Sequence, residues 1–347
     1  MDLRLTEEQR ALQESVMALL SREVSTADVR RAESMGLDRR LWGLMAATGL
    51  PGIGVAERLG GGGGGLLEMC LVTEAAGAAL APVPLVGTLA ASRLLSRAGA
   101  EGELTPILSG HTIASLATGH GPIGSQLLAD GAAADVVVAM EPSGLVVHDR
   151  PHDVSASPAR NMGGLLAAFW PGITAGRVLL SGPEAKRLWE AALDETRVLL
   201  AAALVGLARS ATEIGAQYSK ERSAFGQPIA MYQAVAHPFA DALTAQDGAQ
   251  MLVWKAAWAL DSGDPRGPAL ASSAFVFAAE TAFAAAGHSL HVHGGYGFME
   301  EYDIQLYYRR AKAWACAFSD PERELLLVAD RRFGRAPALS AQPSGAR

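Results

Sequence analysis

The segment from Arg222 to Gln233, RSAFGQPIAMYQ, is the part of this chain best suited to hold a ligand. Arg222 is predicted to close a long helix, the chain turns at Phe225 and Gly226, and Pro228 is predicted to start the next helix. An arginine at such a corner presents five N–H donors in a fixed fork, which suits a pyrophosphate. The alternative is an ordinary surface arginine on a turn between two helices.

Two other groups of residues are weaker candidates for a ligand-binding site. The run from Gly60 to Gly65 has no strand before it and no Gly-Lys-Ser/Thr after it, so a flexible turn is favoured over a phosphate cradle. The cluster of His288, His291 and His293 lacks a fourth ligand at a fitting spacing, so we predict no metal site. Helix-end packing and a cofactor contact both stay open for these histidines.

Composition excludes several classes of protein. The chain has 347 residues and a net charge of -7, so it lacks the basic surface that nucleic acid or an anionic membrane requires. Cys70 and Cys316 lie far apart, which predicts no disulfide framework and a reducing compartment. The longest apolar run, residues 198–208, is shorter than the roughly 20 residues of a membrane span. We therefore expect a cytoplasmic protein.

Helical patterns dominate the first hundred residues. Thr6 and Gln9 form a capping-box pattern that opens a helix to about Leu20. Further helices are predicted near 40–48, 66–80 and 85–97, with prolines between the last two. Short apolar segments near 112–118, 135–140 and 144–148, separated by Gly, Pro and Asp, then predict strands.

The helical pattern returns at Ser181, which is expected to cap a helix together with Glu184. This helix runs to about 222, and others follow near 232–260 and 268–287, from about 302, and after Pro321. Long helices with short connections predict a bundle. The predicted divisions are residues 1–104 (helical), 105–180 (a small β domain), 181–335 (a helical bundle) and 336–347 (a disordered tail).

Three motifs resemble the acyl-CoA dehydrogenase family and together span residues 1 to about 330. The segment 222–233 resembles Arg-x-x-Phe-Gly-x-Pro-Ile-x-x-x-Gln, and HVHGGYGF at 291–298 with YRRAK at 308–312 resembles the Gly-Gly turn and the Arg-Asp-Ala-Lys segment. Residues 57–61 with Glu74 and Gly77 resemble the family's N-terminal loop and helix. The resemblance implies a mainly α fold with an N-terminal helical domain, a middle β domain and a C-terminal four-helix bundle.

The resemblance also implies FAD as cofactor and an acyl-CoA thioester as substrate. In this family, the matching segments hold the diphosphate and adenosine end of a flavin that belongs to a neighbouring chain. The candidate FAD contacts here are Arg222, Phe225, Tyr232, Gln233, His291, Gly294 and Gly295. His291 stands where the family has glutamine and still has a hydrogen-bond donor. Asp194 and Arg197 match a stretch that contacts the substrate.

The sequence departs from the family at the general base, the carboxylate that removes the α proton. The two positions that supply this glutamate in different members correspond to Thr196 and Phe318, and neither residue can act as a base. Glu195 and Asp320 lie nearby. Glu195 is rotated by about 100° around its helix, and Asp320 lies on a loop, so both are weak candidates.

The middle domain departs as well. Only a threonine and a glycine of the family's Thr-Glu-Pro strand are kept, at Thr118 and Gly119, and Leu127 and Ala129 fall where Trp and Thr are expected. The strand and loop that cover the chain's own flavin ring are therefore predicted to be deleted. The residues that match contacts to a neighbouring chain's flavin are kept. The residues that would cover the chain's own flavin ring and supply its base are missing.

This pattern resembles the short subunit of actinobacterial α2β2 acyl-CoA dehydrogenases, several of which serve steroid catabolism. We therefore expect a subunit that works with a second, catalytically complete chain and an electron-accepting flavoprotein. Two alternatives stay open. One is a homotetrameric dehydrogenase with a displaced base, and the other is a scaffold subunit without catalytic function.

Overall fold

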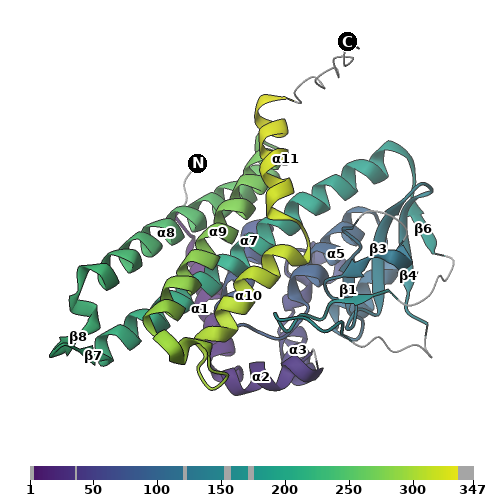
Figure 1. Cartoon of the computed structure of the whole chain (residues 1–347). Helices are drawn as coiled ribbons and strands as arrows, with labels where there is room; N and C mark the ends of the chain where they lie inside the picture. Colours follow the sequence, from purple (N-terminus) through teal and green to yellow (C-terminus); the bar gives the residue numbers. More distant parts are fainter. Residues whose placement is uncertain (1–3, 36, 120–122, 152–157, 171–175, 335–347) are drawn as a thin grey trace, which may run out of the picture.

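The computed structural model describes residues 4–35, 37–119, 123–151, 158–170 and 176–334. Its elements form an N-terminal helical region, a small β region and a C-terminal helical bundle (Figure 1). This arrangement confirms the predicted mainly α class with a small β domain. The predicted tail at 336–347 lies outside the described residues.

The N-terminal region is helical, and its helix at Leu66–Ala78 is buried on nearly all sides. Its first helix begins with the expected capping box, in which the amide of Gln9 donates to Thr6 Oγ1 at 3.2 Å. A second helix was not predicted, because four of its ten residues are charged; among its residues whose burial is described, Val29 and Ala32 are buried. The helices are α1 (Glu7–Glu23), α2 (Thr26–Met35), α3 (Arg39–Ala47), α4 (Leu66–Ala78), α5 (Leu85–Arg97) and α6 (Glu101–Leu108).

The middle region is built on a four-stranded sheet in the order β1-β3-β4-β6. Strands β1 and β3 are parallel, and β3 and β4 form an antiparallel hairpin whose valines are buried. A separate two-stranded pair joins β2 to β5. The strands are β1 (Ala114–Leu116), β2 (Leu127–Leu128), β3 (Val136–Glu141), β4 (Gly144–Asp149), β5 (Ala168–Phe169) and β6 (Arg177–Leu180).

The C-terminal bundle is arranged around one 40-residue helix, α7, which packs against α4, α5, α8, α9 and α10. In Figure 1 the last helix, α11, extends upward from the bundle, while the connection between α7 and α8 forms a tip at the left. The helices are α7 (Gly182–Glu221), α8 (Gln233–Asp261), α9 (Gly267–Val292), α10 (Ile304–Ala317) and α11 (Pro321–Phe333).

One prediction about a helix start was wrong, and another was correct in position but not in its side-chain bond. Pro228 does not start a helix. It ends a short hairpin of β7 (Ser223–Ala224) and β8 (Gln227–Pro228), and a 3-10 turn precedes α8. Ser181 is the N-cap of α7, but its side chain does not bond to the helix backbone there.

Two bundle helices are long and apolar enough to pass for membrane spans by composition. These are α7 and α9, and 78% and 61% of their most apolar stretches are buried inside the structure. Their apolar side chains pack against each other and against the neighbouring helices. Core packing therefore accounts for this composition.

Helices α4 and α7 touch backbone to backbone where they cross. A Cβ atom on Gly77 would lie 1.9 Å from the carbonyl oxygen of Ala203, and one on Gly206 would lie 1.9 Å from that of Glu74. Only glycine at both positions permits this approach. The crossing matters for function because Gly77 and Ala203 also line the central pocket.

Candidate functional site

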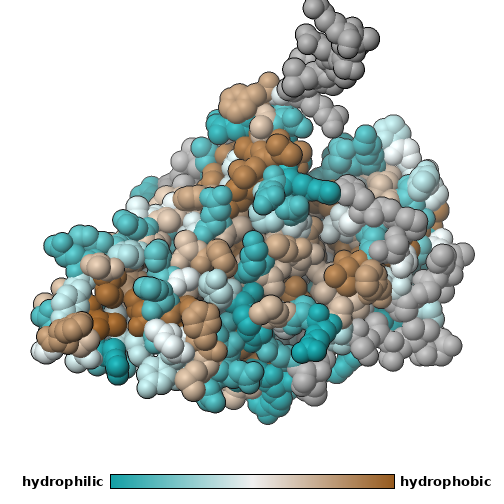
Figure 2. All heavy atoms as spheres, viewed as in Figure 1, coloured by the Kyte–Doolittle hydropathy of each residue, from teal (hydrophilic) through white to brown (hydrophobic). Residues whose placement is uncertain are grey.

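The tip between α7 and α8 carries most of the predicted FAD contacts. The hairpin turns at Phe225 (φ 52°) and Gly226 (φ 83°). A phenylalanine with positive φ is strained, and such strain is found mostly where a side chain must be held in a specific place. The turn holds the Phe225 side chain 97% exposed to solvent. Figure 2 shows apolar surface gathered at this tip.

Three of the predicted contacts line one groove of about 340 Å³. They are Phe225, Tyr232 and His291, and the groove lies between the start of α8 and the end of α9. The Phe225 and Tyr232 rings meet edge to face at 6.5 Å, and the Tyr232 hydroxyl donates to the carbonyl of Ala224 at 3.1 Å. The structure thus brings together residues separated by about sixty positions.

The other four predicted contacts are exposed and are not part of the groove wall: Arg222, Gln233, Gly294 and Gly295. A Cβ atom on either of the two glycines would meet nothing within 4 Å, so their backbone faces open space. The Arg222 guanidinium makes no hydrogen bond or ion pair with any residue that the structure describes. Its donors are therefore free for a phosphate, as FAD binding requires.

The three histidines separate into two environments. His293 is buried and stacks on Tyr218 at 3.9 Å, and its Nδ1 lies 2.6 Å from the carbonyl oxygen of Ser289. His288 and His291 line the groove. Within the described ranges, no group of three His, Cys, Asp or Glu residues is placed to hold a metal ion.

The glycine run at 60–65 is a turn before α4. The first amides of this helix are already bonded to carboxylates, because Gly65 donates to Glu68 at 2.8 Å and Leu66 donates to Asp261 at 2.6 Å. These side chains occupy the positions that a phosphate would need. The structure therefore supports the turn and gives no support to a phosphate cradle.

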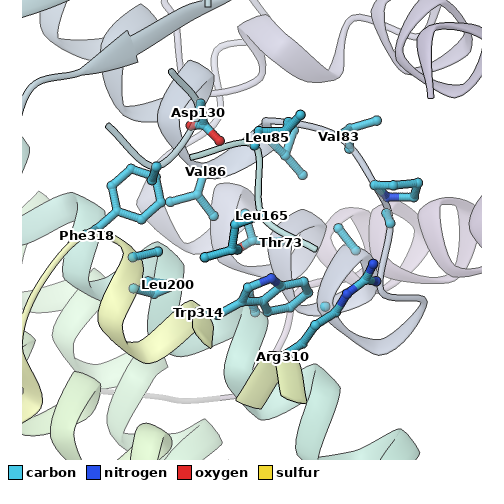
Figure 3. A pocket seen from close by; sticks show the side chains of 18 of the residues that line it. Thr73, Val83, Leu85, Val86, Asp130, Leu165, Leu200, Arg310, Trp314 and Phe318 are labelled. Carbon is cyan, nitrogen blue, oxygen red and sulfur yellow. The ribbon is translucent and has the colours of Figure 1, made fainter. Parts of the chain in front are cut away.

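A second, central pocket lies where the three regions meet (Figure 3). Its volume is about 100 Å³, which is small beside the roughly 300–1,000 Å³ of sites that bury a drug-sized ligand. Its wall is mostly apolar and comes from α4, α5, the β region, α7 and α10. It includes one of the two positions at which the family carries its base, Phe318.

The other base position does not reach this pocket. Thr196 is buried in α7, and its hydroxyl donates to the carbonyl of Ala192 at 2.7 Å, within its own helix. One turn further on, Leu200 lines the pocket instead. Neither family position supplies a group that could take up a proton in this chain.

The two weak candidates for a displaced base are held away from the pocket. Glu195 is 2% exposed, and its Oε1 accepts from Arg97 at 2.6 Å and from Arg93 at 3.2 Å. Asp320 caps the N-terminus of α11 and accepts from the amide of Glu322 at 3.1 Å. Neither lines the central pocket. Their geometry favours structural roles, and their part in catalysis stays a prediction.

The predicted substrate contacts belong to a buried ion-pair network. Arg197 donates to Asp194 at 2.9 Å and to Glu324 at 2.8 Å, and Asp194 also pairs with Arg331 at 2.7 Å. Burial raises the pKa of Asp194 in spite of its two arginine partners. The network joins α7 to α11, so in this structure both residues are engaged within the chain.

Only some of the middle-domain positions that correspond to ring-facing residues of the family lie at the central pocket. Ala129 lines the pocket, whereas Leu127 is 51% exposed and points elsewhere. The hydroxyl of Thr118 donates to the carbonyl oxygen of Phe318 at 3.1 Å, which ties the β region to the end of α10. The two-residue strand β2 lies in this part of the chain, and the predicted deletion stays a prediction.

One carboxyl group of the pocket was not predicted from the sequence. Asp130 is buried, accepts a hydrogen bond from Ser115 at 3.1 Å and follows Ala129 directly. Burial raises its pKa to about 6. The sequence signal that could have identified Asp130 is a single aspartate among apolar residues. It directly follows Ala129, the position at which the family has a residue that faces the flavin ring. Asp130 packs against Gly87 of α5, where an added Cβ would lie 2.1 Å from its Oδ2.

We expect Glu195→Gln and Asp320→Asn, made separately in the complex with the partner chain, each to keep turnover within about threefold. Loss of a true general base costs about 10²- to 10⁴-fold. The measurement is steady-state reduction of an electron acceptor at saturating acyl-CoA, with FAD content checked in both variants. Loss of turnover with FAD still bound would place the base in this chain.

Comparisons with known proteins agree with these features. The description "Acyl-CoA dehydrogenase, C-terminal domain" matches residues 187–331, and "Acyl-CoA dehydrogenase, N-terminal domain" matches residues 6–103. These two matches cover both helical regions and leave residues 104–186 between them. The chain belongs to the acyl-CoA dehydrogenase family, whose members are FAD-dependent oxidoreductases acting on the CH–CH bond of acyl-CoA thioesters.

Individual relatives span nearly the whole chain. Acyl-CoA dehydrogenase IpdE2 of Mycolicibacterium smegmatis is 30% identical over 92% of this chain and 97% of its own length. A solved structure described as the Tcur3481-Tcur3483 steroid ACAD G363A variant has a TM-score of 0.83 and 26% identity, covering 94% of this chain and 97% of that one. The ChsE4-ChsE5 complex from Mycobacterium tuberculosis, with a TM-score of 0.82 and 24% identity over 97% of this chain and 100% of that one, shares the fold.

Proposed function

We propose that this chain is one subunit of a heteromeric FAD-dependent acyl-CoA dehydrogenase. It supplies the half-site for the FAD diphosphate and adenosine to a partner chain, and the partner supplies the base and the pocket for the flavin ring. The observation that carries the proposal is the contrast between the two sites. The tip presents Arg222, which has no side-chain partner among the described residues, beside an aromatic groove, while the pocket wall has Phe318 at a base position.

The residues of the tip fit this role chemically. Arg222 would hold the diphosphate, Phe225 and Tyr232 would flank the adenosine end, and His291 would donate a hydrogen bond in place of the usual glutamine. When bound, FAD accepts the hydride from the β carbon of the acyl group. This chain would hold and orient that cofactor, while proton removal is assigned to the partner.

The two sites are far apart along one helix. Leu200 in the pocket and Arg222 at the tip are separated by 22 residues of α7, or about 33 Å at 1.5 Å per residue. This separation favours a tip that serves a flavin bound mainly by another chain. The solved Tcur3481-Tcur3483 steroid ACAD, whose description names two different proteins, supports a heteromeric assembly.

We further propose a steroid-derived acyl-CoA as the first substrate class to test and an electron-transferring flavoprotein as the electron acceptor. The steroid proposal rests on the description of the Tcur3481-Tcur3483 structure. The acceptor proposal rests on a structural neighbour described as an electron transferring flavoprotein.

The complex is expected to hold about one FAD per two chains, and this chain expressed alone is expected to hold little. The reason is that each flavin would use one tip and one complete ring pocket. Flavin absorbance relative to protein concentration, measured for the chain alone and for the purified complex, tests this ratio. A stoichiometrically yellow homo-oligomer of this chain would instead support the homotetramer, and a colourless complex would support the scaffold.

A further inference from the structure

A short segment of the β region lies against the wall of the central pocket. Gly164, Leu165 and Leu166 all line the pocket. Figure 3 shows the Leu165 side chain between Phe318 and Trp314. The same pocket is lined by Ala129 and Phe318, which correspond to a ring-facing position and a base position of the family. The segment therefore takes up space at the place where a complete chain would bind its ligands.

The segment is built to keep a fixed shape. Asn161 organises it, because its Oδ1 accepts from the amides of Gly163 at 3.0 Å and Leu165 at 2.9 Å. The amide of Ala132 donates to Leu166 O at 2.8 Å, which joins the segment to the β region. These bonds close a compact turn and aim Leu165 at the pocket.

Two arginines of α10 attach the segment to the bundle. Arg309 donates to the carbonyl of Met162 and pairs with Glu33 of α2 at 2.8 Å. Arg310 donates to Gly163 O at 3.3 Å and to Leu80 O at 2.9 Å. A Cβ atom on Gly163 would lie 2.1 Å from that of Ala313, so the segment touches α10 directly.

The attachment coincides with a departure from the family motif. The family has Arg-Asp-Ala-Lys, and this chain has Arg309-Arg310-Ala311-Lys312, so a buried arginine stands in place of an aspartate. Arg310 is 3% exposed, and its backbone-carbonyl partners are Gly163 of the segment and Leu80, which follows α4. An aspartate has no donor for these carbonyls. The substitution therefore creates the anchor.

We propose that residues 161–166 form an internal plug, which fills this chain's own ligand pocket and is anchored by Arg309 and Arg310. The plug leaves a cavity of about 100 Å³, too small for a flavin ring or a long acyl group. The plug proposal rests on the proposed function only in assigning the working flavin site to the partner. It adds that this chain's own ligand pocket is filled by residues 161–166 as well as lacking a base.

Removing the plug side chain should open an apolar cavity that binds benzene, as enlarged apolar cavities do. The test uses the complex with 5-fluorotryptophan in this chain, where Trp314 lines the pocket and its ¹⁹F resonance is assigned with Trp314→Phe. Benzene is expected to leave the wild-type resonance unchanged and to shift it saturably in Leu165→Ala. Leu252→Ala, which truncates another half-buried leucine away from the pocket, should show no such shift.

A second variant tests the anchor without opening a cavity at Leu165. In Arg310→Met, hydrogen exchange of peptides spanning 158–170, measured by mass spectrometry, should be at least about tenfold faster than in wild type. A saturable benzene shift in the wild-type complex, or none in a folded Leu165→Ala, would overturn the plug. Unchanged exchange in Arg310→Met would overturn the anchor. The FAD content of these complexes tests the proposed function separately.

Discussion

Replacing Arg222 with alanine is expected to strip FAD from the complex, although this chain supplies no base. A charge-assisted bond to the diphosphate contributes on the order of 1.5–3 kcal/mol, or roughly 10- to 150-fold in affinity. The guanidinium lies at the exposed end of α7, and none of its donors is used by the described residues. The change should therefore leave folding unaffected. FAD retention after gel filtration at low micromolar cofactor measures the loss.

Two further variants sharpen this test. Arg222→Lys keeps the charge but loses the two-pronged geometry, so its FAD affinity should fall between those of wild type and Arg222→Ala. Arg323→Ala removes another exposed arginine, on α11, and should leave FAD content unchanged. Full FAD occupancy in Arg222→Ala under these conditions would count against the assignment of this segment.

Adding a single methyl group at Gly206 is expected to destabilise the chain strongly. In Gly206→Ala the new Cβ would lie 1.9 Å from the carbonyl oxygen of Glu74, and this contact is with backbone, so no rotamer change can relieve it. Overpacking of a core costs about 1–3 kcal/mol or more. The thermal midpoint of the complex should fall, and the pocket wall formed by Gly77 and Ala203 should be displaced.

The matched control is Gly43→Ala. Gly43 also lies inside a helix, α3, but a Cβ atom there would meet nothing within 4 Å. Because alanine favours the helix over glycine by about 1 kcal/mol, the thermal midpoint should stay the same or rise. Equal midpoints for the two variants would show that α4 and α7 do not need their backbone contact.

The helices and the tip could be predicted from the sequence because their signals are local. The capping box at Thr6, the apolar content of α4 and the apolar periodicity of α5 and α7 each predict an element without reference to the rest of the chain. The segment around Arg222 was recognisable for the same reason, since its residues are contiguous and its turn is formed by Phe225 and Gly226. The helix α2 was missed because four of its ten residues are charged and few are large and apolar.

The central pocket depended on the tertiary structure. Its wall combines residues from five parts of the chain, among them Asp130, Leu165 and Arg310, and no local pattern predicts that they meet. Pro228 was wrongly predicted to start a helix for a related reason, because it pairs in a hairpin with the residues after α7, whereas α8 begins at Gln233, close to the start predicted near 232.

The sequence by itself determined the family, the order of the three regions and the absence of a glutamate at Thr196 and Phe318. Only the tertiary structure decided that Glu195 is bound by Arg93 and Arg97, away from the pocket, and that Leu165 occupies it. The physical reason is that residue type is set by the chain, whereas burial, ion pairing and the filling of a cavity are set by which elements pack together.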